Sequence, residues 1–209
     1  MQLVATKTRT YNSTRRSRQA AQTREEIVTA AIELFGETGW AGTTLAAIAE
    51  RAGVAVETIY SGFGSKKGLL RAAMDVAVVG DVEEVPLADR PESLRLGEGP
   101  LDQRLRAAAA LIADIHERSI GVWRALVEAA RADEELERLR NDLEGGRRDE
   151  IARSLERIFG RTIEGRILDL LWAIFGTEVY AKLVLDAGLS RADYEACMVD
   201  ALVGLTATS

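Results

Sequence analysis

The chain has 209 residues, 47% of them hydrophobic, and a net charge of −6, so it can bury the core of one large domain or of two joined ones. Aromatic residues make up only 5% and there are three prolines, a composition that favours helices over a sheet. The single cysteine, Cys197, excludes an intrachain disulfide, and no stretch approaches the ~20 apolar residues of a membrane span. We therefore expect a cytoplasmic chain that has no membrane partner.

Charge is distributed unevenly along the chain. Residues 1–74 carry ten basic side chains against six glutamates, a balance of +4 that leaves −10 for residues 75–209. Residues 1–22 contain five basic residues, no acid and many Ser and Thr, which predicts a basic flexible arm. All three prolines lie within residues 80–100, and this segment is predicted to connect helices. We expect a first domain at residues 23–79 and a second at residues 80–209.

The first domain is predicted to be a series of helices with two short ones in the middle. Apolar spacing predicts a helix over about residues 24–36. A two-turn helix follows, capped by Thr43 or Thr44 and ended by Gly53. The next short helix ends in the run GFGS, whose serine, Ser65, caps a fourth helix. Two short helices joined by a glycine turn are the layout of a helix-turn-helix, whose second helix enters the DNA major groove.

The glycines also allow a nucleotide-binding loop as an alternative. Gly62, Gly64 and Gly68 give G-x-G-x-x-x-G, but both common phosphate loops have a different spacing and follow a strand, which is absent from this pattern. Lys66 and Lys67 fall in the first turn of a helix, where a cation opposes the helix dipole unless an anion is near. DNA phosphates would supply that anion, and solvent-exposed lysines are the plain alternative. We prefer DNA to a nucleotide as the partner.

The run TTLAAIAERAGVAVETIYSGFGSKKGLL resembles the DNA-binding domain of the TetR-type transcriptional regulators, over about residues 24–79. The resemblance implies an all-α fold: an N-terminal three-helix DNA-binding domain with a helix-turn-helix, and a C-terminal helical ligand-binding and dimerisation domain. It implies phosphate contacts from Thr44, Thr58, Tyr60 and Lys66. It implies that three other side chains meet the bases, namely Val56, Glu57 and Ser61; a valine can touch a thymine methyl and a glutamate can accept from cytosine.

Three residues depart from the family pattern. Ala55 replaces the usual serine cap, Glu57 brings a negative charge where small residues are common, and Gly62 lacks an aromatic or histidine side chain. Glu57 has a second interpretation, as a favourable first-turn residue of a helix. These departures leave more of the DNA affinity to the basic arm, and its candidate contacts are Arg15, Arg16 and Arg18.

Residues 101–209 are predicted to form the second, helical domain. Residues 101–130 read as one long helix and a shorter one, and residues 131–160 as a third that Gly145 and Gly146 can kink or break. The last two helices are predicted over residues 163–187, capped by Thr162, and after Ser190.

The predicted helix over residues 163–187 is apolar on more than one face, so it must be buried on several sides. A second subunit is the natural partner, and the resemblance implies that the last two helices form a four-helix interface of a homodimer. The predicted interface residues are Val179, Leu183, Tyr194, Met198 and Leu202.

The resemblance also implies a small-molecule effector in the second domain. Candidate pocket residues are Met74, Ile115, His116, Trp123, Leu126, Ile151, Leu155, Trp172 and Phe175. Each of them has an alternative as ordinary core, and His116 as a surface or hydrogen-bonded helix residue. One His and one Cys make no zinc or copper site, and no catalytic motif is found. We expect no metal, no cofactor and no enzymatic activity.

Together these patterns predict a ligand-responsive DNA-binding transcriptional regulator. It would be a homodimeric repressor that leaves a palindromic operator of double-stranded DNA when a small apolar effector binds. An activator is an open alternative. From another class, the alternative is a helical small-molecule- or partner-binding module with a degenerate helix-turn-helix that does not bind DNA specifically. The effector, the operator and the regulated genes cannot be deduced from these motifs.

Overall fold

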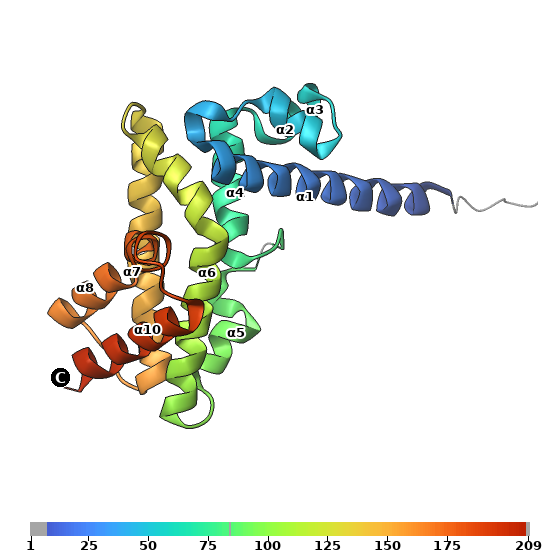
Figure 1. The fold of residues 1–209 in the computed structure, drawn as a ribbon. Coiled ribbons are helices and arrows are strands. Elements are labelled where there is room, and N and C mark those ends of the chain that lie inside the picture. Colours follow the sequence, from blue (N-terminus) through green and yellow to red (C-terminus); the bar gives the residue numbers. More distant parts are fainter. Residues whose placement is uncertain (1–7, 84, 208–209) are drawn as a thin grey trace, which may run out of the picture.

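The structure is a computed structural model that describes residues 8–83 and 85–207, with the backbone alone for residues 8–15. Its described residues form helices and turns without a strand (Figure 1). The α-helices are α1 (Thr8–Gly42), α2 (Leu45–Ala52), α3 (Val56–Phe63), α4 (Lys66–Val79), α5 (Pro91–Leu94), α6 (Leu101–Ala130), α7 (Glu134–Phe159), α8 (Gly165–Ile174), α9 (Thr177–Tyr180) and α10 (Arg191–Thr206). Two 3-10 turns, η1 (Leu87–Asp89) and η2 (Arg95–Gly97), and a π-helical turn, η3 (Ala181–Asp186), complete the list.

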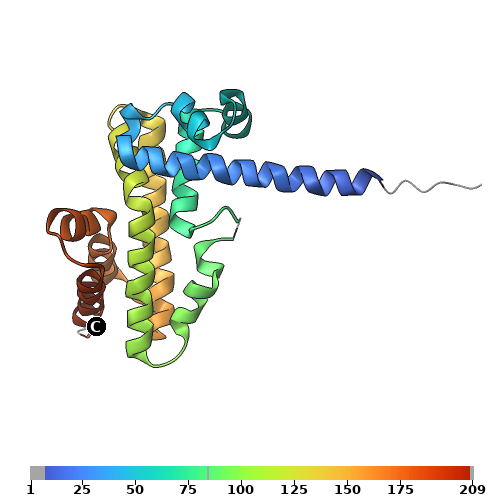
Figure 2. The same cartoon turned by 45° about the vertical axis from the view of Figure 1, so that its right-hand side comes forward.

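The first helix begins earlier than predicted and has a kink at Gly39 near its end. Residues 8–22, which we expected in a flexible arm, continue α1 back to Thr8, and this end reaches away from the rest of the molecule (Figure 2). The physical reason is that residues 8–35 contain neither Gly nor Pro and include several Arg, Gln and Ala, which are good helix formers. Residues 1–7 of the predicted arm lie outside the described residues, as does the side chain of Arg15.

The helix-turn-helix forms through the predicted caps. The Thr44 side chain accepts from the backbone N–H of Ala47, and α2 ends at Gly53, which has a left-handed φ of 67°. Ser65 caps α4 by accepting from the N–H of Gly68 at 3.1 Å. A Cβ atom on Gly68 would lie 2.1 Å from the Phe63 carbonyl oxygen. The glycine-rich run is therefore a tight turn between α3 and α4, and no strand precedes it among the described residues.

Two hydrophobic cores share α6. The N-terminal core packs α1 to α4 against the second half of α6 and the start of α7; its buried residues include Ile27, Phe35, Ile48, Ile59, Leu70, Leu126 and Leu136. The C-terminal core packs the first half of α6 against α7, α8 and α10; its buried residues include Leu96, Leu105, Ala109, Leu155, Leu168, Phe175 and Met198. Figure 2 shows α6 and α7 side by side, with α8 and α10 along one side of them.

The helices of the second domain differ from the prediction in three places. Residues 101–130 form one uninterrupted helix, α6, and α7 runs through Gly145 and Gly146 without a break. The helix predicted over residues 163–187 is instead divided into α8, α9 and η3. The division is stabilised from α7, because Arg147 donates to the carbonyls of Trp172 and Phe175 that the end of α8 leaves free.

The predicted caps of the last two helices have different outcomes. Thr162 does not cap α8, whose N-cap is Glu164 without a side-chain hydrogen bond. Ser190 caps α10 as predicted, because its hydroxyl accepts from the N–H of Asp193. None of the helices in the described residues is both long and apolar enough to cross a membrane.

The crossing of α1 and α6 joins the two domains and depends on a pair of glycines. A Cβ atom on Gly121 would lie 2.7 Å from the Cα of Gly36, a separation that packed atoms do not tolerate. The carboxylate of Glu128 also accepts the backbone N–H groups of Trp40 and Ala41, at 2.9 and 3.2 Å. These bonds hold the end of α1 where the chain turns at Gly39 (φ 67°).

We predict that Gly121→Ala destabilises the protein by about 1–3 kcal/mol, because the added methyl group forces α1 and α6 apart. Thermal and urea unfolding of the two proteins measure the difference. Gly145→Ala is the matched control: this glycine is exposed in the middle of α7 with nothing near its Cβ position. Alanine there should be neutral or stabilising. Equal stability of Gly121→Ala and the unaltered protein would contradict the proposed importance of the crossing.

Candidate functional site

The outer face of α3 carries four of the predicted base and phosphate contacts. Glu57, Thr58, Tyr60 and Ser61 are exposed, Tyr60 by 54%, whereas Ile59 between them is fully buried. The burial of Ile59 anchors the helix and leaves this face free to enter a groove. Val56, the remaining predicted base contact on this helix, is half-buried against the N-terminal core, and its contact with a base stays a prediction.

The predicted phosphate contacts that flank α3 are arranged in different ways. The Thr44 hydroxyl accepts the cap hydrogen bond of α2, and its proton is left to donate, so capping and phosphate binding are compatible. The ammonium of Lys66 instead lies 4.0 Å from the centre of the Trp40 ring and donates to the Trp40 carbonyl oxygen. Partial burial lowers the pKa of Lys66. Lys66 therefore secures the end of α1 in this conformation.

Helix α1 carries further basic residues, of which one lies beside α3. Arg16 and Arg18 are exposed on its extended half. Arg24, which was not among the predicted site residues, places its guanidinium 4.7 Å from the centre of the Phe63 ring at the end of α3. Its position in the sequence carries no signal for this contact, because the contact depends on how α1 and α3 pack.

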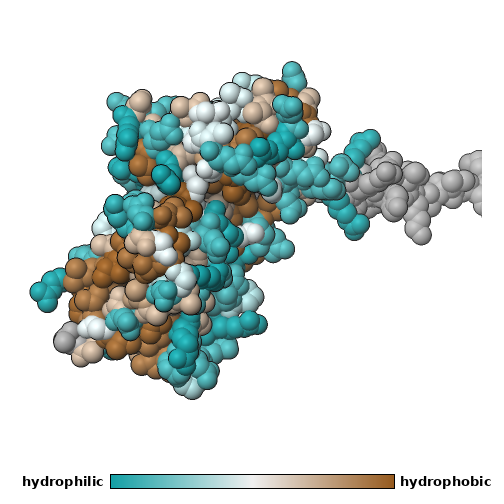
Figure 3. Space-filling view, in the orientation of Figure 1, coloured by the Kyte–Doolittle hydropathy of each residue, from teal (hydrophilic) through white to brown (hydrophobic). Residues whose placement is uncertain are grey.

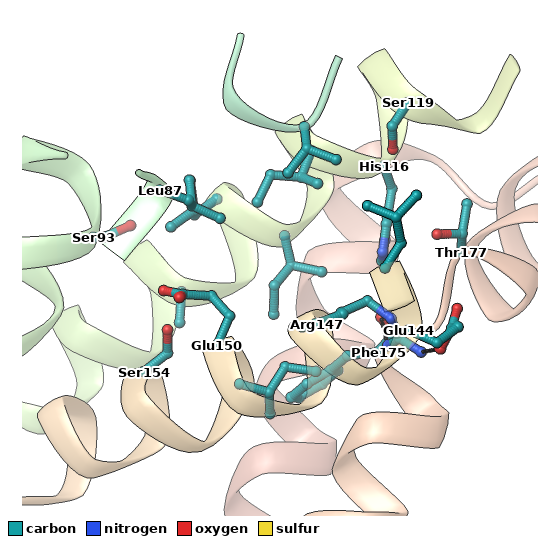
Figure 4. A pocket seen from close by; sticks show the side chains of 18 of the residues that line it. Leu87, Ser93, His116, Ser119, Glu144, Arg147, Glu150, Ser154, Phe175 and Thr177 are labelled. Atoms are coloured by element: carbon teal, nitrogen blue, oxygen red, sulfur yellow. Dashed lines mark hydrogen bonds and ion pairs between the residues drawn. The ribbon is translucent and has the colours of Figure 1, made fainter. Parts of the chain in front are cut away.

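A cavity of about 360 Å³ lies between α4, α5, α6 and α7 and has a mostly apolar lining (Figure 4). Its volume falls in the range of about 300–1,000 Å³ that is usual for small-molecule sites. The predicted pocket residues that line it are Met74, Ile115, His116, Trp123, Ile151, Leu155 and Phe175.

Two predicted pocket residues lie elsewhere. Leu126 is fully buried in the N-terminal core, about one turn further along α6 than Trp123, and does not line the cavity. Trp172 is absent from the cavity lining and lies beneath the guanidinium of Arg147, 5.4 Å from the ring centre. The polar part of the lining was not predicted; it includes Ser93, Ser119, Glu144, Arg147, Glu150 and Thr177.

His116 is buried in the cavity wall, within a cluster of aromatic residues. Its Nδ1 atom lies 2.9 Å from the hydroxyl of Tyr194, and its ring centre lies 5.5 Å from that of Tyr180. Burial, followed by the nearby charge of Arg147, lowers the pKa of His116 to about 4, so the imidazole is neutral near pH 7. His116 therefore lines the cavity and is at the same time a hydrogen-bonded residue of α6.

Three of the predicted dimer contacts face the inside of the subunit. Tyr194, Met198 and Leu202 are at most 1% exposed in the C-terminal core, so in this conformation they cannot touch a second subunit. The prediction took the wrong side of α10, since that helix is apolar on more than one face. Val179 and Leu183 are half-buried. The exposed apolar residues of this region include Leu170 on α8 and Val203 on α10.

Helix α4 connects the helix-turn-helix with the cavity. At its start, Lys67 pairs with Asp133 at 2.6 Å and with Glu135 at 3.0 Å. Further along, Met74 and Val78 line the cavity. At its end, Arg118 of α6 donates to the carbonyl oxygens of Ala77 and Val78. One helix, α4, therefore both follows the turn after α3 and lines the cavity.

The helix-turn-helix domain packs through α1 and α4 against α6, which belongs to a domain with an apolar cavity. This arrangement is that of helix-turn-helix regulatory proteins. Residues 27–73 match the family model described as bacterial regulatory proteins, tetR family. A curated relative, the HTH-type transcriptional regulator BetI of Stenotrophomonas maltophilia, is 33% identical over 119 residues. The match covers 56% of this chain and 58% of BetI, so the chain aligns with little more than half the length of that relative.

Solved structures share the fold over most of the chain. A tetR-family transcriptional regulator from Streptomyces coelicolor is 22% identical with a TM-score of 0.65, covering 88% of this chain and 83% of its own. A putative tetR-family regulator from Mesorhizobium loti is 20% identical with a TM-score of 0.62, covering 90% and 97%. The family match is thus confined to the helix-turn-helix domain, and the likeness to the solved structures extends the common fold over most of the chain.

We predict that the stability of the protein falls between about pH 6.5 and pH 4 partly because of His116. The pKa of His116 is near 6.5 in the unfolded chain and about 4 in the folded protein. The unfolded state therefore binds a proton more readily, and acidification stabilises it relative to the folded state. The loss can reach about 3 kcal/mol below pH 4. Urea unfolding at pH 7 and at pH 4.5 measures it, and His116→Gln should lose less stability between the two values. An equal loss in both proteins would contradict the prediction.

Proposed function

We propose that the chain is a homodimeric repressor that binds a palindromic DNA operator and is released by a small molecule bound in the cavity. The observation that carries the proposal is the exposed face of α3, with Thr58, Tyr60 and Ser61 free of the core and Arg24 beside it. Two copies of α3 presented ~34–36 Å apart would enter successive major grooves. The proposal locates the protein in the cytoplasm, with its DNA.

The coupling between effector and DNA would run through α4. An effector that prefers one position of Met74 and Val78 would shift α4, and with it the turn that holds α3. The ion pairs of Lys67 are partly accessible to solvent, so they oppose this movement only weakly. The coupling free energy cannot exceed the difference in effector affinity between the two conformations, typically ~1–3 kcal/mol.

An apolar surface on α8 and α10 supports the homodimer. Leu170 is 42% exposed and Val203 is 48% exposed, and Ala173 and Ala196 are exposed on the same two helices. Apolar residues gather over this region in the space-filling view (Figure 3). Small and apolar residues allow two helices to approach closely, and burying them against a second copy is favourable.

We predict that Val203→Glu lowers the fraction of dimer, because it would bury a charge in the interface. Sedimentation velocity of the full chain at several concentrations measures that fraction. Leu94→Glu is the matched control, since Leu94 is 50% exposed on α5, which belongs to a different part of the fold. If the two variants have the same sedimentation behaviour as the unaltered chain, α10 is not in the interface.

We predict that Thr58→Val weakens binding to the operator by about tenfold or more, because a hydrogen bond to a charged phosphate is lost. Stability should be unchanged, since Thr58 is exposed. Thr29→Val is the matched control, an exposed threonine on α1 among Glu25, Glu26 and Glu33. The operator comes from selecting bound sequences from a random DNA pool with the full chain, and affinity is then titrated at two salt concentrations.

The selection also tests the function itself. An enriched palindrome bound by a dimer, with an affinity that falls steeply as salt rises, supports a sequence-specific regulator. Weak binding without any sequence preference would refute the sequence-specific regulator. It would favour a helical small-molecule- or partner-binding module that does not bind DNA specifically. Repression is tested separately, by placing the selected operator in front of a reporter gene and comparing expression with and without the chain.

A further inference from the structure

The charged residues in the cavity lining are mostly acidic. Three carboxylates, from Asp142, Glu144 and Glu150, line the cavity with one guanidinium, from Arg147, and Arg153, which is not in the lining, pairs with Glu150. His116 adds no positive charge near pH 7, because burial lowers its pKa to about 4. All four charged residues belong to α7, whereas α4 and α6 contribute mainly apolar side chains to the lining.

Arg147 is already neutralised and engaged. It forms an ion pair with Glu144 at 2.5 Å, and its NH1 group donates to the Trp172 and Phe175 carbonyl oxygens at 2.8 and 3.1 Å. Its Nε–H is buried without a hydrogen-bond partner in the described part of the chain, but its charge is balanced by Glu144. The cavity therefore offers no unneutralised cation to an anionic ligand.

Glu150 has one oxygen that is satisfied and one that is not. Its Oε2 atom accepts from the Nε and NH2 groups of Arg153 at 3.1 and 2.6 Å. Its Oε1 atom is buried and has no hydrogen-bond partner among the described residues. Buried carboxylate oxygens are nearly always hydrogen-bonded in folded proteins, because an unpaired one has lost its water without compensation. A donor is therefore missing at this atom.

A second unpaired group lies at the same end of the cavity. The Ser93 side chain, from α5, is 1% exposed, and its Oγ atom has no partner in the described part of the chain. Figure 4 shows Ser93, Ser154 and the carboxylate of Glu150 together at the α5 end, with His116, Arg147 and Thr177 at the other end. A carboxylate and two hydroxyls are a suitable environment for an ammonium group, which has three donors and no acceptor.

Building on the proposed function, we propose that the effector is an amphipathic amine: an apolar body with one primary or secondary ammonium group. The ammonium donates to Glu150 Oε1 and to the Ser93 hydroxyl. The apolar body extends along Ile112, Ile151 and Met74, so that it touches α4. Carboxylate ligands of the same size are disfavoured, because they would add a like charge beside Glu150 and have no free cation to pair with.

Three probes with the same alkyl chain and different head groups test this proposal: decylamine, decanol and decanoate. Each is titrated into the full-length protein below its micelle-forming concentration, by calorimetry and by tryptophan fluorescence, since Trp123 lines the cavity. We expect decylamine to bind about tenfold or more tightly than decanol, because a charge-assisted hydrogen bond is added. Decanoate should bind most weakly of the three.

The variant Glu150→Gln should weaken decylamine about tenfold and leave decanol nearly unchanged, and Ser93→Ala should weaken decylamine by a smaller factor. Glu156→Gln is the matched control, an exposed glutamate of α7 that does not line the cavity. Tighter binding of decanoate than of decylamine, no binding of decylamine, or equal decylamine affinity in Glu150→Gln and Glu156→Gln would each overturn the proposal.

The outcome is separable from the test of the proposed function. If the protein selects a palindrome but does not bind decylamine, the proposal of a regulator stands and the proposal of an amine effector is refuted. If the protein binds decylamine through Glu150 but selects no DNA sequence, the proposal of an amine site stands and the proposal of a regulator is refuted. Release of the selected operator by decylamine, but not by decanoate, would support both.

Discussion

One helix, α6, is part of both hydrophobic cores, and the relation between the two domains follows from this. Its first half buries Leu105 and Ala109 among α7, α8 and α10, and its second half buries Val122 and Leu126 among the helices of the DNA-binding domain. In the described part of the chain the domains therefore meet along a shared helix. Relative movement requires α1 or α4 to slide over the side of α6, against close packing.

The helix-turn-helix could be predicted from sequence because its determinants are local. Thr44 and Ser65 cap helices with their own side chains, and Gly53 ends α2 in a left-handed turn that glycine adopts readily. The division of residues 163–187 could not be predicted, because it depends on Arg147 from another helix. The extent of α1 was missed for a different reason: a basic, Ser-rich composition outweighed the absence of helix breakers.

The site was predictable to the extent that it is apolar. Apolar spacing located the walls of the cavity on α4, α6 and α7. It could not distinguish Trp123, which lines the cavity, from Leu126, which is buried in the N-terminal core about one turn further along α6. Spacing carries no information on Glu150, because α7 is polar along most of its length. Polar specificity of a buried site depends on which few charged residues of such a helix turn inward, and only packing decides that.

The contact of Gly36 with Gly121 has a consequence for protein engineering. A chimera that joins the DNA-binding domain of one tetR-family regulator to the sensing domain of another brings together two helix surfaces that did not evolve side by side. In this chain Gly121 accepts no side chain, because a Cβ atom there would lie 2.7 Å from the Cα of Gly36, whereas a Cβ atom on Gly36 would be in ordinary contact at 3.7 Å. A sensing domain with even an alanine at the position of Gly121 would hold α1 away from α6, and the bonds from Glu128 to the end of α1 would be stretched. Compatibility of small residues at this crossing is therefore a criterion for choosing domains to exchange.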